Sequence, residues 1–250
     1  MVKAITTDLK KIFGDFHVYL CMLALGAVFA ISYGELIREQ GHFFNFTSVY
    51  GMMTGGTLRL FCFLICIVGG VSLHCTEERH GYVYYTIQRT NVKIYTISKL
   101  LTSFLSGFVT SMVGFIINTV VIILLTYISY EDKSLIWPTS VELELYLWEI
   151  VLFCMLCGVL AAIGFVVATF YANFYVAVTA PIILYYALLS LYDWFNMPMA
   201  FQISKVYLSV GFIDTPCLHQ FIYACLYTAC HIVIFYKIAI GRIQRRVEHA

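Results

Sequence analysis

The densest group of charged residues in this chain lies in one polar segment between two long apolar stretches. Two glutamates open the segment, a glycine follows, and a mixed apolar and basic stretch leads back to the next apolar run at Lys99. Glu77 and Glu78 suit the N-terminal end of a short helix, and Gly81 permits a tight turn or a close backbone approach. Basic side chains beside an apolar run can contact anionic lipid headgroups. This pattern predicts a short docking helix that lies along a membrane surface.

Two adjacent glutamates also invite comparison with membrane proteases that carry an E-E-x-x-x-R motif. Tyr82 stands where that motif needs arginine, so the motif fails. The sequence contains no H-E-x-x-H motif and no G-x-x-x-x-G-K-[ST] phosphate loop. We therefore expect no catalytic residue, no metal site and no cofactor on this chain, and ATP hydrolysis would need a separate polypeptide.

The composition places this polar segment in a membrane protein. Of 250 residues, 61% are hydrophobic and 12% are charged, whereas soluble domains average about 45–50% and about 25%. One soluble core of this size could not bury so much apolar surface. The aromatic content of 17% excludes a disordered chain, and the net charge of +1 gives no reason to expect nucleic acid.

Six apolar stretches are long enough to cross a bilayer as helices. They are residues 16–34, 58–75, 100–130, 147–170, 176–192 and 218–240. With the N-terminus inside, 11 of the 15 basic residues fall on the inner side, which is the bias that cytoplasmic loops show. We expect an all-α membrane protein with six transmembrane helices and both termini in the cytoplasm.

The chain is expected to form one domain, residues 1–250, with three segments that do not span the membrane. Residues 1–15 carry apolar positions at helical spacing and basic positions off that stripe, which predicts an interfacial amphipathic helix; a positively charged leader is the alternative. Residues 76–99 form the polar segment. Residues 193–217 are rich in aromatic side chains and are expected to dip into the outer interface as short helices.

Small residues recur every fourth position in two of the predicted spans, and such rows let helices approach closely. They predict packing within the chain, with a subunit contact as the alternative. The C-x-x-C spacing of Cys154 and Cys157 lies inside a span and is interpreted as apolar packing. The rows are Ser103, Gly107 and Ser111, and Cys154, Gly158 and Ala162.

Polar and aromatic residues inside the spans are candidates for a translocation path. Arg59 and Glu149 lie near the outer boundary, where they could snorkel to the interface, pair with each other or contact a substrate. His231 lies near the middle of its span and is expected to bond to a neighbouring helix or to relay protons. Tyr185 and Tyr186 could line a path for amphipathic cargo, with ordinary core packing as the alternative. Pro181 could allow a kink that acts as a gate, with a purely structural kink as the alternative.

The polar segment resembles that of the ABC-2 type permeases of ABC transporters. Those permeases carry an acidic residue shortly before a glycine, then a stretch that ends in basic residues and a lysine opening the third span. Glu77 to Gly81 and Lys93 to Lys99 look like that pattern. Tyr82 departs from it where a small residue is expected, and the basic position before Lys99 is displaced by about one residue. The six-span, N-in layout and the preceding surface helix are also similar to the family.

The resemblance implies a permease subunit of an ATP-driven exporter in a bacterial plasma membrane. It implies a dimer with a second permease copy, identical or different, and a separate ABC ATPase subunit that binds ATP and magnesium. The second and fifth spans would flank the path, and residues 193–217 would cap it. The residues implied in docking the ATPase are Glu77, Glu78, Arg79, Gly81, Tyr82, Arg89, Lys93 and Lys99.

Few fixed charges in the spans suggest a hydrophobic or amphipathic cargo, and an antimicrobial or toxin-like peptide is the favoured choice. A drug or a lipid-linked polysaccharide is the alternative cargo. A secondary transporter with inverted three-helix halves is the alternative mechanism, although the two halves show no visible sequence similarity to each other.

Overall fold

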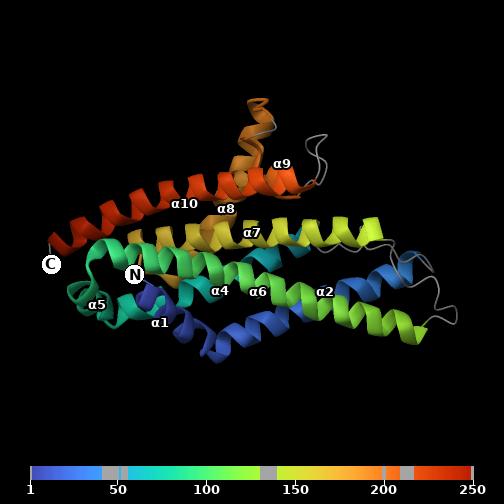
Figure 1. The fold of residues 1–250 in the computed structure, drawn as a ribbon, viewed down its shortest axis with the longest axis horizontal. Coiled ribbons are helices and arrows are strands. Elements are labelled where there is room, and N and C mark those ends of the chain that lie inside the picture. Colours follow the sequence, from blue (N-terminus) through green and yellow to red (C-terminus); the bar gives the residue numbers. More distant parts are fainter. Residues whose placement is uncertain are drawn as a thin grey trace.

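A computed structural model describes residues 2–40, 51, 56–129, 140–198, 201–208 and 217–248 of the chain. The described residues form helices and contain no strand, which confirms the predicted all-α class. The helices are α1 (Val2–Phe13), α2 (Phe16–Gln40), α4 (Gly56–Arg79), α5 (Tyr82–Thr90), α6 (Val92–Ser129), α7 (Ser140–Phe170), α8 (Phe174–Trp194), α9 (Ile203–Leu208) and α10 (Cys217–Glu248). Figure 1 shows most of them running side by side along one long axis.

Five helices are long and apolar enough to cross a membrane, namely α4, α6, α7, α8 and α10. A sixth crossing is counted if α1 and α2, which meet at a bend of 62°, form one broken span. Each of the six predicted spans corresponds to a helix. The third predicted span is longer than expected, because α6 contains 38 residues and is about 57 Å long at 1.5 Å per residue.

The end of α4 and the start of α5 correct one detail of the sequence interpretation. Glu77 and Glu78 lie in the last turn of α4, so the prediction that they open the short surface helix is wrong. The helix ends only where the Gly81 backbone adopts a left-handed φ of 72°, which other residues rarely adopt. The Gly81 N–H donates to the Glu78 carbonyl at 3.1 Å, and α5 begins at the next residue.

Helix α7 forms the centre of the bundle, and 83% of its most apolar stretch is buried inside the protein. Its tightest seam is with α6, where a Cβ added to Gly107 would lie 2.8 Å from the Cys157 carbonyl oxygen. A Cβ at Gly158 would lie 2.9 Å from the Phe104 carbonyl oxygen. The small-residue rows therefore pack within the chain, as predicted. Cys154 and Cys157 are buried free cysteines in this seam.

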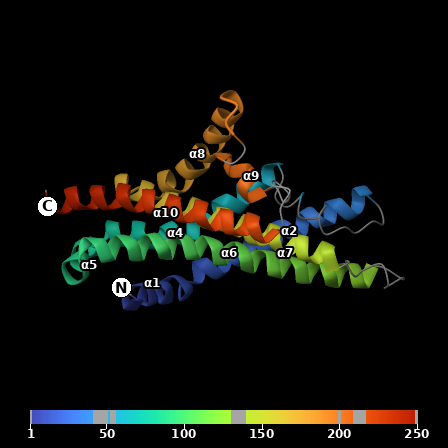
Figure 2. The same cartoon turned by 45° about the horizontal axis from the view of Figure 1, so that its top comes forward.

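Helices α8 and α10 are much less enclosed than α7. Only 28% of the most apolar stretch of α8 and 11% of that of α10 are buried inside the protein. Figure 2 shows α8 rising away from the rest of the bundle. The short helix α9 follows α8 in the chain and contacts α10, where the Tyr207 hydroxyl lies 2.7 Å from Thr228 Oγ1. Within the predicted outer segment 193–217, α9 is thus one short helix; residues 199–200 and 209–216 lie outside the described residues.

A helix, α1, is present over Val2–Phe13 within the segment predicted to be an interfacial amphipathic helix. Ile12 is buried against Val18 and Met22 of α2, so its apolar positions pack partly on the protein itself. At the bend, the Asp15 carboxylate accepts hydrogen bonds from His17, through the ring Nδ1 at 2.8 Å and the backbone N–H at 3.1 Å. These bonds cap α2 and lower the pKa of Asp15.

Candidate functional site at the basic end of the bundle

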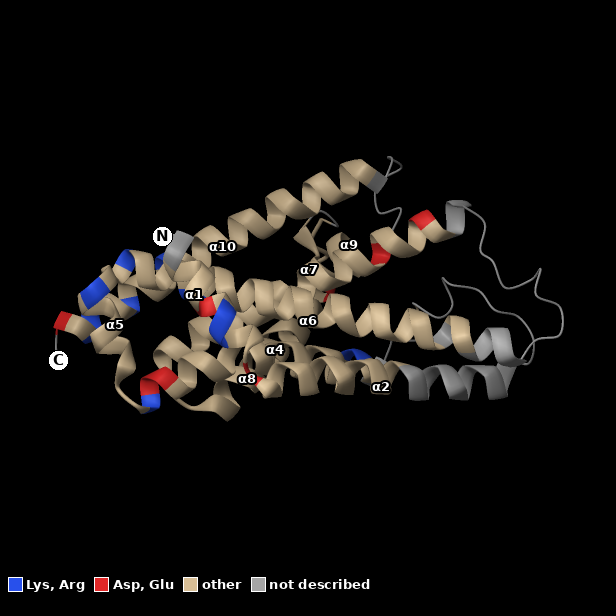
Figure 3. Ribbon diagram, turned by 60° about the horizontal axis from the view of Figure 1, so that its bottom comes forward, with Lys and Arg blue, Asp and Glu red and all other residues tan. Residues whose placement is uncertain are grey.

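Most lysines and arginines of the described chain gather at the end of the bundle where both termini and α5 lie (Figure 3). We call this the basic end. It receives the last turns of α1, α4 and α10, the first turns of α6, and the whole of α5. Its cations are Lys10, Lys11, Arg79, Arg89, Lys93, Lys99, Arg242, Arg245 and Arg246.

A buried ion cluster joins three helices at this end. Lys99 Nζ lies 2.9 Å from Asp8 Oδ1 and 2.8 Å from Glu77 Oε2, and these side chains are 4%, 11% and 7% exposed. Ser98 donates to the second Asp8 oxygen at 2.7 Å, and Lys11 Nζ lies 3.4 Å from Glu77 Oε1. Two cations therefore balance two carboxylates, which is the arrangement that makes buried charge tolerable. We call this set, from α1, α4 and α6, the Lys99 cluster.

Two separate ion pairs explain how two glutamates are tolerated at the end of α4. The C-terminal end of a helix carries partial negative charge and disfavours carboxylates there. Glu77 is compensated by the cations of α1 and α6. Glu78 is compensated from another side, because Arg246 Nη1 of α10 lies 2.6 Å from its Oε1. Arg246 Nη2 donates to the Phe170 carbonyl at 3.1 Å, which ties the end of α7 into the same junction.

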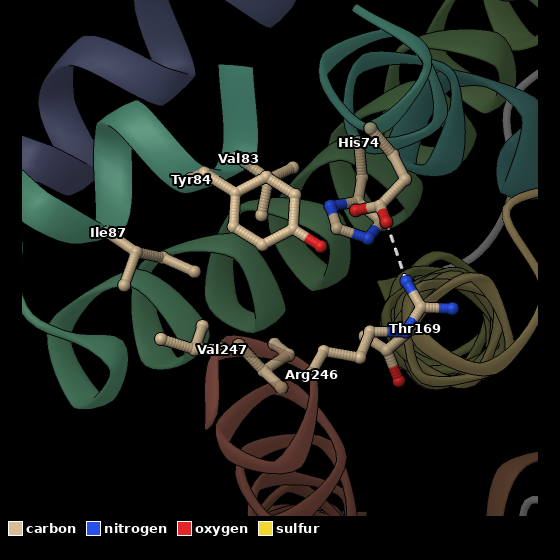
Figure 4. A pocket seen from close by; sticks show the side chains of 9 residues that line it. His74, Val83, Tyr84, Ile87, Thr169, Arg246 and Val247 are labelled. Carbon is tan, nitrogen blue, oxygen red and sulfur yellow. Dashed lines mark hydrogen bonds and ion pairs between the residues drawn. The ribbon is translucent and has the colours of Figure 1, made fainter. Parts of the chain in front are cut away.

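A small cavity lies beside this second ion pair and is lined by residues of α4, α5, α7 and α10. Figure 4 shows His74 and Tyr84 facing one another across it, with Arg246 reaching in from α10. His74 Nδ1 lies 3.0 Å from the Tyr95 hydroxyl, and the ring packs edge-on against Phe165. The cavity offers about 10 Å³ to the centre of a water molecule, which is room for one water.

Helix α5 rests on this junction as a fixed surface helix. Val83 and Ile87 are buried on a cluster contributed by α6, α7 and α10. At its far end Asn91 takes a φ of 85°, its N–H bonds to the Ile87 carbonyl, and its side chain accepts from the Lys93 N–H at 3.3 Å. The predicted short helix after Gly81 is therefore present. The other buried residues of this cluster are Tyr95, Leu100, Ala162, Phe165, Val166, Ala239 and Ile243.

The outer face of α5 is aromatic and basic. Tyr82 and Tyr85 are 58% and 65% exposed, and Arg89 is exposed beside them. Between α5 and α1 runs a groove of about 590 Å³, which we call the α1–α5 groove. It is lined by Lys11, Glu77, Tyr82, Tyr85, Thr86, Arg89 and Thr90.

The structure divides the eight residues that the sequence interpretation assigned to docking. Glu77, Glu78 and Lys99 hold the protein's own helices together at the two ion junctions. Gly81 forms the turn and is partly buried. The four side chains that reach the surface are Arg79, Tyr82, Arg89 and Lys93.

The six path candidates lie away from this end and line neither the α1–α5 groove nor the small cavity. Tyr185 is buried edge-on to Phe63, with ring centres 5.1 Å apart, and lies beside Tyr186 at 5.2 Å. Pro181 is buried inside α8. The two aromatic side chains thus take part in core packing.

The charged path candidates do not form the pair that was one alternative. Among the described ion pairs there is none between Arg59 and Glu149, and the buried Glu149 Oε2 has no hydrogen-bonding partner in the described part of the chain. Arg59 is half-buried at the start of α4. His231 Nδ1 lies 2.8 Å from the Tyr227 carbonyl of its own helix, so the described bond of this ring is made within α10.

Several residues of the junction were missed at the sequence level. Lys11 was interpreted only as a basic position off the apolar stripe, Arg246 was counted only among the basic residues of the inner side, and Asp8 was not considered. Asp8 offered a signal, because it is the single acidic residue among the first 14 and stands between Leu9 and Thr7, close to the apolar stripe. His74 and Tyr95 gave no signal, because a contact between different helices depends on the packing.

The described residues thus form an all-helical protein with five or six candidate membrane spans and one strongly organised polar end. Comparison of the chain with protein-family models, with curated proteins and with solved structures finds no match. Among the described residues no group of three or more His, Cys, Asp or Glu side chains could hold a metal ion.

Proposed function

We propose that this chain is the transmembrane permease subunit of an ATP-driven exporter and that a separate ATPase subunit docks on the outer face of α5. The observation that carries the proposal is the attachment of α5. It is a surface helix with an exposed aromatic and basic face, it contacts α4 and α6, and its buried residues Val83 and Ile87 belong to one apolar cluster with residues of α6, α7 and α10. A force applied to α5 would therefore reach several long helices together.

The ion junctions strengthen this mechanical argument. Glu77 joins the end of α4 to α1 and α6, and Glu78 joins it to α7 and α10 through Arg246. Removing one partner of a buried ion pair costs about 3–5 kcal/mol, so these contacts do not open easily under load. Rigid-body movement of the helices is the motion that such a linkage favours.

The distribution of charge supports the proposed orientation. Cytoplasmic segments of membrane proteins carry an excess of lysine and arginine, and these residues gather at the basic end. We place this end, with both termini and α5, in the cytoplasm of a bacterial cell. The partner ATPase would bind ATP and magnesium there, because this sequence has no phosphate loop.

The proposed cargo is hydrophobic or amphipathic, with a peptide as the favoured choice. Helices α4 and α8 would flank the path in a dimer of two permease copies, and α9 would lie near its outer mouth. Pro181 leaves the Ala177 carbonyl without its helical donor. That carbonyl faces α7, because a Cβ added to Gly164 would lie 3.1 Å from its oxygen. The first half of α8 is thus held against the bundle, whereas Leu191 and Trp194 near its end are exposed, and the proposed path would lie beside that end.

The test is to purify the tagged chain from its native membrane and identify a co-purifying protein that contains a phosphate loop. ATP hydrolysis by that complex is then measured with Tyr82→Ala, which removes an aromatic ring from the exposed face of α5. We expect this variant to lower ATPase recovery and transport-coupled hydrolysis at least tenfold. Tyr175→Ala is the matched control, because Tyr175 is 78% exposed but belongs to α8.

The control should retain the ATPase and its activity. Absence of any co-purifying ATPase, together with unchanged transport in Tyr82→Ala, would refute the permease proposal. Equal losses in Tyr82→Ala and Tyr175→Ala would refute docking on α5 in particular.

A further inference from the structure

We propose that the α1–α5 groove is a binding site for the headgroup of an anionic phospholipid. The groove has a volume of about 590 Å³, within the range of small-molecule sites. Its lining combines two cationic side chains, two tyrosines and two threonine residues around one carboxylate. The groove shares Tyr82, Tyr85 and Arg89 with the face of α5 proposed above for the ATPase, so the lipid and the ATPase would compete for these side chains, and lipid binding is measured on the chain alone.

The charges of the groove favour an anion. Lys11 is 52% exposed and touches Glu77 only at 3.4 Å, so its ammonium group remains available at the surface. Arg89 is exposed and takes part in none of the described ion pairs. The carboxylate of Glu77 is already neutralised from behind, since Lys99 Nζ lies 2.8 Å and 2.9 Å from its two oxygens. Lys99 and Lys11 together balance Asp8 and Glu77, so Arg89 supplies the net positive charge of the groove.

The chemistry of the two cations fits a phosphodiester. Arginine presents a planar fork of donors to phosphate oxygens, and lysine adds a compact positive charge. The cations come from different helices, Lys11 from α1 and Arg89 from α5, so an anion between them would be held from both sides. The Tyr82 and Tyr85 rings are amphipathic and suit the headgroup level of a membrane.

The position of the groove favours a lipid over a free ion. Helix α1 ends at Phe13 and α2 begins at Phe16 after the bend. Along α2, Phe16, Leu20 and Leu23 are 75%, 54% and 61% exposed and form an apolar stripe that needs acyl chains to cover it. Lys11 lies in the last turn of α1, just before the 62° bend that leads into this stripe. A lipid whose tails lie on α2 therefore brings its phosphate to the level of the groove.

The experiment measures lipid binding to the full chain in detergent by native mass spectrometry. Phosphatidylglycerol and phosphatidylcholine with identical acyl chains are titrated separately. We expect phosphatidylglycerol to bind at least fivefold more tightly. Arg89→Gln should weaken its binding about fivefold, since one cation near an anionic headgroup contributes about 1 kcal/mol. Lys11→Gln should weaken it by a similar factor.

The matched control is Arg245→Gln. Arg245 is an exposed cation of the same basic end, but it does not line the groove. Its removal should change the affinity for phosphatidylglycerol less than twofold. Equal losses in Arg245→Gln and Arg89→Gln would overturn the proposal, because they would reveal a diffuse attraction to the basic end. Equal affinity of the wild type for the two lipids would overturn it as well.

An acidic protein segment is the competing occupant, and a decapeptide of glutamate serves as its probe. We expect phosphatidylglycerol to remain bound in the presence of an equimolar amount of this peptide. If the peptide displaces the lipid and its own binding depends on Arg89, the groove is a protein-docking site and the lipid proposal is wrong. Thermal unfolding of Arg89→Gln at the wild-type temperature would show that a loss of binding is not a loss of folding.

Discussion

The basic end and the α8–α9 side of the molecule are built on different principles. At the basic end, ion pairs at 2.6–2.9 Å connect α1, α4, α6 and α10, and a hydrogen bond at 3.1 Å from Arg246 to the Phe170 carbonyl adds α7. On the other side, α8 stands apart from the bundle, and its end carries the exposed Trp194 and Phe195. Few described polar contacts tie α9 to its neighbours there. The basic end is thus held by ion pairs, whereas α9 is held mainly by apolar packing, because Ile203, Val206 and Tyr207 are buried in the main core.

The largest test of this comparison removes the central cation of the Lys99 cluster. Lys99→Met leaves Asp8 and Glu77 buried with insufficient positive charge, because Lys11 is the only cation left beside them among the described ion pairs. We expect a loss of about 3–5 kcal/mol in stability. For a chain of this size that corresponds to a fall of roughly 10 °C in the thermal unfolding midpoint, measured in detergent.

Two variants check the cause of that loss. Lys93→Met removes an exposed cation from the same helix and should shift stability by less than about 0.5 kcal/mol. Adding Glu77→Gln to Lys99→Met removes one unpaired charge and should restore about half of the lost stability. If Lys93→Met is as harmful as Lys99→Met, the basic end is not held by its buried ion pairs and the contrast with the α8–α9 side loses its basis.

A middle-sized effect is expected at the seam between α6 and α7 in the centre of the bundle. Gly107→Ala places a Cβ 2.8 Å from a backbone carbonyl oxygen of α7, so the helices must separate. We expect a cost of about 1–3 kcal/mol, measured as the thermal unfolding midpoint. Gly241→Ala is the matched change on α10, where an added Cβ meets nothing within 4 Å.

The control should be neutral or stabilising by up to about 1 kcal/mol, because alanine favours a helix over glycine. The reverse order of the two effects would contradict the close α6–α7 seam.

The sequence predicted the helices well because their signal is local. A run of apolar residues is visible without knowledge of the fold, and each predicted span corresponds to a helix. The small-residue rows were also interpretable, since Gly107 and Gly158 need a partner close to their backbone. Gly81 indicated a turn, because glycine readily adopts the positive φ that other residues rarely adopt.

The polar junctions could not be predicted in the same way. The glutamates were placed at the start of α5, because the acidic residues and the glycine were read as one local pattern. Their actual role depends on Lys99, Lys11 and Arg246, which reach them from other helices. The partner of Glu78 is separated from it by 168 residues, so only the packing of α4 against α10 reveals the pair.

The smallest expected effect concerns the contact that holds α9 to α10. The hydroxyl of Thr228 donates to the Ala224 carbonyl at 2.7 Å, so it accepts a hydrogen bond from the hydroxyl of Tyr207. Tyr207→Phe removes this bond while keeping the ring, and we expect a loss of about 1 kcal/mol. Hydrogen exchange of the α9 amides measures the effect locally, and Tyr175→Phe at an exposed site should leave exchange unchanged.

The pH dependence of this effect has a definite sign. Burial raises the pKa of Tyr207 above its usual value, which is about 10. The neutral phenol is therefore the form held in the folded protein, and its contribution is fully present below about pH 10. Above that pH the unfolded chain ionises first, so the advantage of the wild type over Tyr207→Phe should decline. A difference that already declines between pH 6 and pH 8 would contradict a buried, neutral Tyr207, and α9 would then owe its position to apolar contacts alone.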